Sequence, residues 1–152
     1  LVIASHDLQW LHSICDRTFH MHRGTIFGTG LETIIFGPWR PFSENRWAKE
    51  IDADRKIIVT PPPSKDSAAV LGWENIKLSD SASGADGDNC IKGVVFRLLF
   101  QKNGARIVGT VLAGNVPFTL KLSEGQILRS GLIPGKEVYI SFKSDDAKWI
   151  FP

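Results

Sequence analysis

Residues 89–142 consist of short apolar or alternating segments separated by turn signals, and this pattern limits the region to a small antiparallel β fold. Segment 94–100 is rich in β-branched and aromatic residues, and Asn103 and Gly104 follow it. Asn-Gly between two apolar runs is the strongest short-range hairpin signal, because both central residues of the tight turn need positive φ. We therefore predict a hairpin whose return strand covers 105–112.

Two further strands and one helix follow this hairpin. Segment 118–122 alternates between apolar and polar residues, and 138–142 does the same. Between them, Ser123 and Gln126 have the spacing of a capping box that opens a short helix, and Gly131 is placed to end it. Several short strands with one helix in about 60 residues favour a small barrel of the OB type. The expected fold is mainly β, with an OB-like barrel module and an N-terminal α/β stub.

The distribution of turn-forming residues divides the chain into four parts. The stub covers 1–27, and a β-rich connecting segment covers 28–79. Small polar residues, Gly and Asp fill 80–88, a composition that buries little apolar surface and predicts a flexible linker. The β-barrel module covers 89–152.

Composition excludes several classes of protein. The 152 residues carry 18 Lys and Arg against 16 Asp and Glu, a net charge of +2, which argues against a strongly basic nucleic-acid binder. No apolar run approaches the roughly 20 residues that a membrane-spanning helix needs. The two cysteines, Cys15 and Cys90, lie far apart without metal-ligand spacing, which favours a reduced, cytosolic chain.

At the start of the chain, an apolar segment leads to His6-Asp7, a helical stretch follows, and then come Asp16-Arg17, a short strand and a turn at Gly24. In this order and spacing, the first 26 residues resemble the last part of an ABC-transporter ATPase domain. The resemblance implies that His6 is the switch histidine that senses the γ-phosphate in the parent ATPase. It also implies that the parent protein uses ATP and Mg²⁺.

The sequence lacks the other parts of an ATPase. ATP hydrolysis needs a Gly-rich phosphate loop with Lys and Ser or Thr, and a carboxylate beside the metal. No GxxxxGK[ST] occurs here, and no apolar strand ends in Asp-Glu. We therefore predict that this fragment is not an enzyme and has no cofactor of its own, with His6 orphaned.

The C-terminal module opens at 89–95 with the pattern Asn-x-hydrophobic-x-Gly-x-Val, and it ends with segment 131–139 followed by Lys143 and Ser144. In both places it resembles the TOBE domain that follows the ATPase in many importers. The greatest likeness is to the molybdate and tungstate importers, whose barrel can hold the oxyanion. This resemblance implies a ligand site that includes Asn89, Lys143 and Ser144. Backbone N–H groups, hydroxyls and a lysine would hold a tetrahedral dianion there without a metal.

The residues before Asn89 depart from that pattern. The family's opening tends to be Ser-Ala-Arg-Asn, whereas this chain has Asp86 and Asp88 in that stretch. Two carboxylates in place of a hydroxyl and a guanidinium should repel a dianion. Two interpretations therefore stay open, an oxyanion-binding barrel and a purely structural or dimerising one.

The combined resemblances predict the C-terminal regulatory region of the ATP-binding subunit of an ABC importer, for an oxyanion such as molybdate or tungstate. Its expected partners are the membrane-spanning permease subunits, which would hold it at the cytoplasmic face of the inner membrane. A homodimer through an apolar edge at 118–120 is a further expectation.

Other residues suggest a metal site or a nucleic-acid surface. His12, His20 and His22 have no carboxylate or thiolate at ligand spacing, so we predict no metal site. Trp39 and Trp47 flank an Arg and two Pro residues, which fits either a stacking platform for nucleic acid or ordinary packing. Packing is the interpretation adopted, with no nucleic-acid partner. The alternative function is an OB-type nucleic-acid or protein-binding module unrelated to transport.

Overall fold

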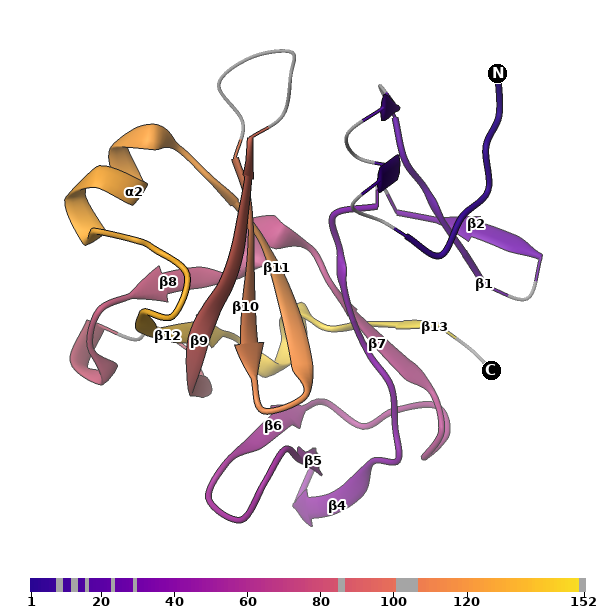
Figure 1. The fold of residues 1–152 in the computed structure, drawn as a ribbon. Coiled ribbons are helices and arrows are strands. Elements are labelled where there is room, and N and C mark those ends of the chain that lie inside the picture. The colour runs from indigo at the N-terminus through magenta and orange to yellow at the C-terminus, as the bar shows by residue number, and fades with distance from the viewer. Residues whose placement is uncertain are drawn as a thin grey trace.

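The protein is mainly β, as the sequence predicts. The computed structural model describes residues 1–7, 10–11, 14–15, 17–22, 24–28, 30–84, 87–100 and 107–150 (Figure 1). Its strands are β1 (His20–His22), β2 (Thr25–Phe27), β3 (Thr33–Ile35), β4 (Arg40–Ser43), β5 (Arg46–Glu50), β6 (Lys56–Val59), β7 (Ala68–Leu71), β8 (Lys77–Ser79), β9 (Asn89–Phe100), β10 (Ile107–Ala113), β11 (Val116–Leu122), β12 (Glu137–Phe142) and β13 (Lys148–Ile150). Helix α2 spans Glu124–Ser130, and the 3-10 turns are η1 (Trp73–Asn75), η2 (Ala82–Gly84) and η3 (Ser144–Asp146).

Five antiparallel strands form the largest sheet, in the order β11-β10-β9-β12-β8. Figure 1 shows β9, β10 and β11 side by side at the centre of the molecule. The predicted hairpin is present as β9 and β10, while its turn at Asn103 and Gly104 lies outside the described residues. The register of this pair shifts between Thr110 and Val111. Such a bulge increases local twist, and the sheet curls into the half-barrel of an OB-like fold.

Local signals in the C-terminal module act as predicted. The Ser123 hydroxyl accepts a hydrogen bond from the Gln126 N–H, and the Gln126 side chain accepts one from the Ser123 N–H, so the capping box is complete. Helix α2 ends at Gly131, which has φ 54° and ψ 44°. This left-handed conformation costs glycine little, because it has no Cβ.

The middle of the chain contributes to two three-stranded sheets, and one of them also contains the C-terminal strand β13. One has the order β13-β7-β3 and the other β4-β5-β6. Strand β13 follows the barrel strands in sequence but pairs with β7, whereas β8 precedes them and pairs with β12. Strand β8 of the connecting segment thus belongs to the sheet of the barrel module, and strand β13 of that module belongs to a sheet of the connecting segment. Both segments contribute to one core. The four-part division of the chain stays a prediction.

The buried hydrophobic residues form one cluster, whose members lie between Ile35 and Ala147 in the sequence. Trp39 is 2% exposed, its ring meets Trp149 edge-on at 5.3 Å, and its indole N–H donates to the Ser67 carbonyl at 2.7 Å. A buried indole with a satisfied N–H is an ordinary core anchor. Trp39 therefore does not present a surface on which a base could stack.

Strand β11 does not offer the apolar edge expected for a homodimer. Phe118 and Leu120 are 0% and 2% exposed, because both point into the core. The Thr119 N–H between them donates to the Thr33 hydroxyl of β3 at 2.8 Å. A homodimer stays a prediction, but these side chains are not available to form it.

The N-terminal stub contains a short helical turn and a hairpin. The Asp7 carboxylate accepts a hydrogen bond from the Trp10 N–H at 3.0 Å, which starts the turn. Strands β1 and β2 follow, joined at Gly24 with φ 79°. Residues 1–5, an apolar strand in the ATPase resemblance, have no regular secondary structure. Among the described residues, none of the helices has the length and apolar stretch that a membrane crossing requires.

Candidate functional site

The structure brings three of the four predicted site residues together at the C-terminal end of β12. Asn89 begins β9 and lies opposite Phe142, the last residue of β12, so Lys143 and Ser144 follow immediately. Asn89 and Ser144 are 2% and 0% exposed, and Lys143 is exposed. His6 is exposed in the irregular N-terminal segment and takes no part in this cluster.

The Asn89 side chain bridges two strands. Its Oδ1 accepts from the Ile58 N–H at 2.7 Å, and its Nδ2 donates to the Ile58 carbonyl at 2.8 Å, which ties β9 to β6. The same Nδ2 lies 3.5 Å from the Phe142 carbonyl. An amide has two donors and one acceptor oxygen, so these contacts occupy both donors. Asn89 therefore has a structural role, because its amide is used by the backbone beneath the cluster.

Ser144 holds a carboxylate of the chain itself. Oδ2 of Asp88 accepts a hydrogen bond from the Ser144 N–H at 3.0 Å and another from the Ser144 hydroxyl at 2.6 Å. Hydrogen bonds to an ionised acceptor are shorter and roughly twice as strong as neutral ones. The donors around Ser144 thus form an anion-binding cluster, whose anion in this structure is Asp88.

Arg46 is a member of this cluster that the sequence analysis missed. It lies at the start of β5, and its Nη1 is 2.9 Å from the same Oδ2 of Asp88. Lys143 adds a second positive charge nearby and favours the ionised form of Asp88. Arg46 and Asp88 are 42 positions apart. No local spacing connects two residues that far apart, so only the packing of the β4-β5-β6 sheet near the start of β9 could reveal the contact.

These donors lower the pKa of Asp88 from its ordinary value of 3.8. The largest cause is the hydrogen bond from the Ser144 hydroxyl, followed by the one from its N–H. The charges of Arg46 and Lys143 act in the same direction, whereas burial opposes them. Asp88 is therefore ionised at neutral pH, and the cluster stabilises a negative charge.

A close approach of two backbone segments places Asp88 in the cluster. Gly87 has φ 151°, and a Cβ at this position would lie 2.6 Å from the Phe142 carbonyl oxygen. Only glycine allows such contact without displacing the backbone. The last two residues of the predicted linker are therefore packed on the end of β12. Asp86, the other carboxylate expected to oppose an anion, lies outside the described residues.

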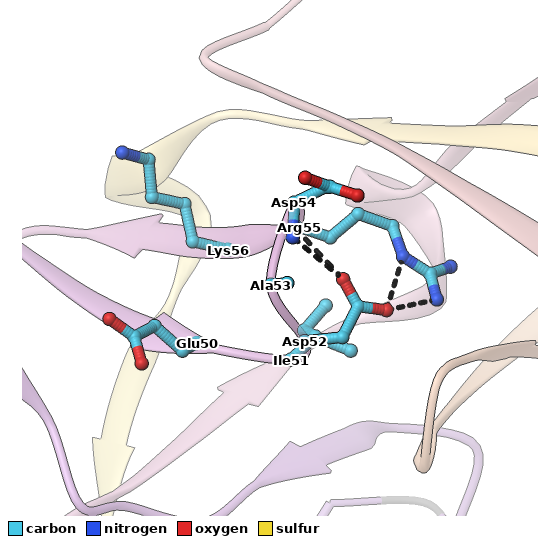
Figure 2. A pocket seen from close by; sticks show the side chains of 7 residues that line it. All are labelled: Glu50, Ile51, Asp52, Ala53, Asp54, Arg55 and Lys56. Carbon is cyan, nitrogen blue, oxygen red and sulfur yellow. Dashed lines mark hydrogen bonds and ion pairs between the residues drawn. The ribbon is translucent and has the colours of Figure 1, made fainter.

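A second polar feature lies in the loop between β5 and β6, where residues 50–56 line a shallow depression (Figure 2). Asp52 accepts hydrogen bonds from the N–H groups of Asp54 and Arg55 at 3.2 and 3.0 Å. Asp52 Oδ2 also pairs with the Arg55 guanidinium, which lowers the pKa of Asp52. Arg55 Nη1 donates to the Lys92 carbonyl at 2.6 Å. These contacts hold the loop on β9.

The histidines do not gather into a metal site within the part of the chain that the structure describes. No group of three His, Cys, Asp or Glu side chains there has the geometry to hold a metal ion. His20 is on β1, in the stub, while His12 lies outside the described residues.

The fold is an OB-like β fold of a kind seen before in a protein that binds an oxyanion. No protein-family model matches the sequence, and no curated protein matches it. Among solved structures, the chain is similar to ModG, a cytoplasmic molybdate-binding protein whose crystal structure contains molybdate. The TM-score is 0.57 at 14% sequence identity, and the match covers 80% of this chain and 95% of that one. At this identity, the likeness establishes the fold.

Proposed function

We propose that this chain is the C-terminal regulatory region of the ATP-binding subunit of an ABC importer, and that its barrel binds a tetrahedral oxyanion such as molybdate or tungstate. Two likenesses support this function. The first 26 residues resemble the end of an ABC-transporter ATPase domain, and the fold is similar to that of a molybdate-binding protein.

The observation that carries the oxyanion proposal is the cluster around Ser144. It offers a backbone N–H, a hydroxyl and the Arg46 guanidinium to one point, where they already hold a carboxylate oxygen. An oxygen of molybdate or tungstate is also an anionic acceptor and suits the same donors. Lys143 would supply further positive charge at the exposed side. No metal is needed to hold such a ligand.

Thermal unfolding with added oxyanion tests this proposal. A ligand at 100 times its dissociation constant stabilises the folded state by about 2.7 kcal/mol, which corresponds to roughly 5–10 °C in Tm for a chain of this size. We expect millimolar molybdate or tungstate to raise the Tm of the wild type and to have little effect on Lys143→Ala. Lys148→Ala, which removes an exposed lysine from β13, is the matched control and should respond like the wild type.

The opposite result is equally clear. If the Tm of the folded protein is unchanged in millimolar molybdate and tungstate, the barrel has a structural role and the oxyanion proposal is wrong. A similar increase with Lys143→Ala would remove that residue from the site.

The transporter context has its own test. In the proposed parent protein, ATP and Mg²⁺ bind to a preceding domain, His6 senses the γ-phosphate, and permease subunits hold the protein at the cytoplasmic face of the membrane. The gene upstream of Leu1 should then encode GxxxxGK[ST] and an LSGGQ-type signature. An upstream sequence without both would reject the importer. The purified chain should not hydrolyse ATP, and turnover that persists in His6→Ala would contradict the proposal.

A further inference from the structure

We propose that Asp88 is a built-in competitor of the oxyanion, so that the ligand binds only after the Asp88 carboxylate has left the Ser144 cluster. This inference rests on the proposed function and adds a form of regulation to it. The internal carboxylate would set the oxyanion concentration at which the barrel responds.

Competition follows from the way in which one oxygen uses the donors. Asp88 Oδ2 lies 3.0 Å from the Ser144 nitrogen, 2.6 Å from the Ser144 hydroxyl oxygen and 2.9 Å from Arg46 Nη1. The N–H and the hydroxyl each provide a single proton, and each forms one short hydrogen bond. An oxyanion oxygen at the same point would overlap with Oδ2. Occupation by Asp88 and by the oxyanion is therefore mutually exclusive.

The structure allows Asp88 to leave without disturbing the rest of the fold. Its side chain is 41% exposed, so water can solvate the carboxylate as it moves out. The next residue, Asn89, is 2% exposed and bonded to Ile58 on β6. Because Asn89 fixes the start of β9 and Gly87 is packed against Phe142, the movement is confined to a rotation of the Asp88 side chain. Ser144 is 0% exposed, so its donors would stay in place.

The internal carboxylate also has a concentration advantage. A group tethered by a short segment has an effective concentration in the millimolar range, which a free ligand must overcome. Removing the competitor therefore increases the apparent affinity without adding a contact. Asp88→Ala should show this gain, whereas Asp88→Asn should show a smaller one, because its amide oxygen can still accept from Ser144 without a charge.

Calorimetric titration with sodium molybdate tests the inference on wild type, Asp88→Ala, Asp88→Asn and Asp145→Ala. Asp145 is the matched control, because its Oδ1 lies 3.4 Å from the Ser144 hydroxyl but its carboxylate does not occupy the point where the three donors meet. Its removal changes the charge beside Ser144 by the same amount. We expect the dissociation constant to fall tenfold or more in Asp88→Ala, equivalent to about 1.4 kcal/mol, and to change much less in Asp145→Ala.

The titration distinguishes the competition by Asp88 from the binding of the oxyanion itself. Equal affinities of wild type and Asp88→Ala would overturn the competition and leave the oxyanion proposal intact. An equal gain in Asp145→Ala would also overturn it, because the effect would then be one of charge alone. If all variants are folded by thermal unfolding and none binds at millimolar molybdate, the oxyanion proposal and this inference are both wrong.

Discussion

Replacing Asn89 with Ala should destabilise the protein in the absence of any ligand. The substitution removes the acceptor of the Ile58 N–H and the donor to the Ile58 carbonyl, at 2.7 and 2.8 Å. A buried polar group without a partner costs about 1–3 kcal/mol. Because Ile58 is only partly buried, water satisfies some of this loss, and the sum for both groups is about 2–4 kcal/mol. That is a large share of the 5–15 kcal/mol typical of a domain.

Urea unfolding at equilibrium measures this loss, with circular dichroism as the signal. Asn115→Ala is the matched control, because Asn115 is exposed in the turn between β10 and β11 and should change stability by less than about 0.5 kcal/mol. If Asn89→Ala is no less stable than Asn115→Ala, the bridge between β6 and β9 does not stabilise the fold. The structural role assigned to Asn89 would then be refuted.

Three further predictions concern the core, the linker and pH. Trp39→Ala should cost about 3–5 kcal/mol in the same urea assay, and Trp39→Phe less, because Phe retains the aromatic contact with Trp149 but loses the bond to Ser67. Gly87→Ala should lower the Tm, because its Cβ would lie 2.6 Å from the Phe142 carbonyl oxygen, and an unchanged Tm would contradict this approach. Asp88 has a lower pKa in the folded state than the ordinary 3.8, so its contacts stabilise the protein above that value and lose their effect as the pH falls through the folded pKa. The stability difference between wild type and Asp88→Asn should therefore shrink on acidification, and a constant difference would show that ionised Asp88 contributes nothing.

Much of the C-terminal module could be predicted from the sequence, because its signals are local. The capping box joins residues three positions apart, and Gly131 acts through its own backbone angles. The β9–β10 hairpin likewise needs only neighbouring strands. Such features depend on propensities that are already present in a short segment. The mainly β, OB-like fold follows from them, and the structure confirms it.

The candidate site was predictable only in part. The resemblance to the TOBE family indicated Asn89, Lys143 and Ser144, and the structure places them together. It did not indicate that the Asn89 amide is used by Ile58, nor that Arg46 reaches the same point from β5. A sequence motif covers residues of one short segment. It gives no information about the distant segment that packs against them in the fold.

The sequence alone therefore determined four strands and the capped helix of the C-terminal module, whereas the tertiary structure decided which distant segments meet. Strand β13 pairs with β7 and not with its neighbours in sequence, and Asp88 reaches Ser144 across 56 positions and Arg46 across 42. Closing such long loops costs entropy that no local signal offsets. It is compensated only by the burial of the shared core and the pairing of complete strands, so the contacts that create the anion cluster exist only in the assembled fold.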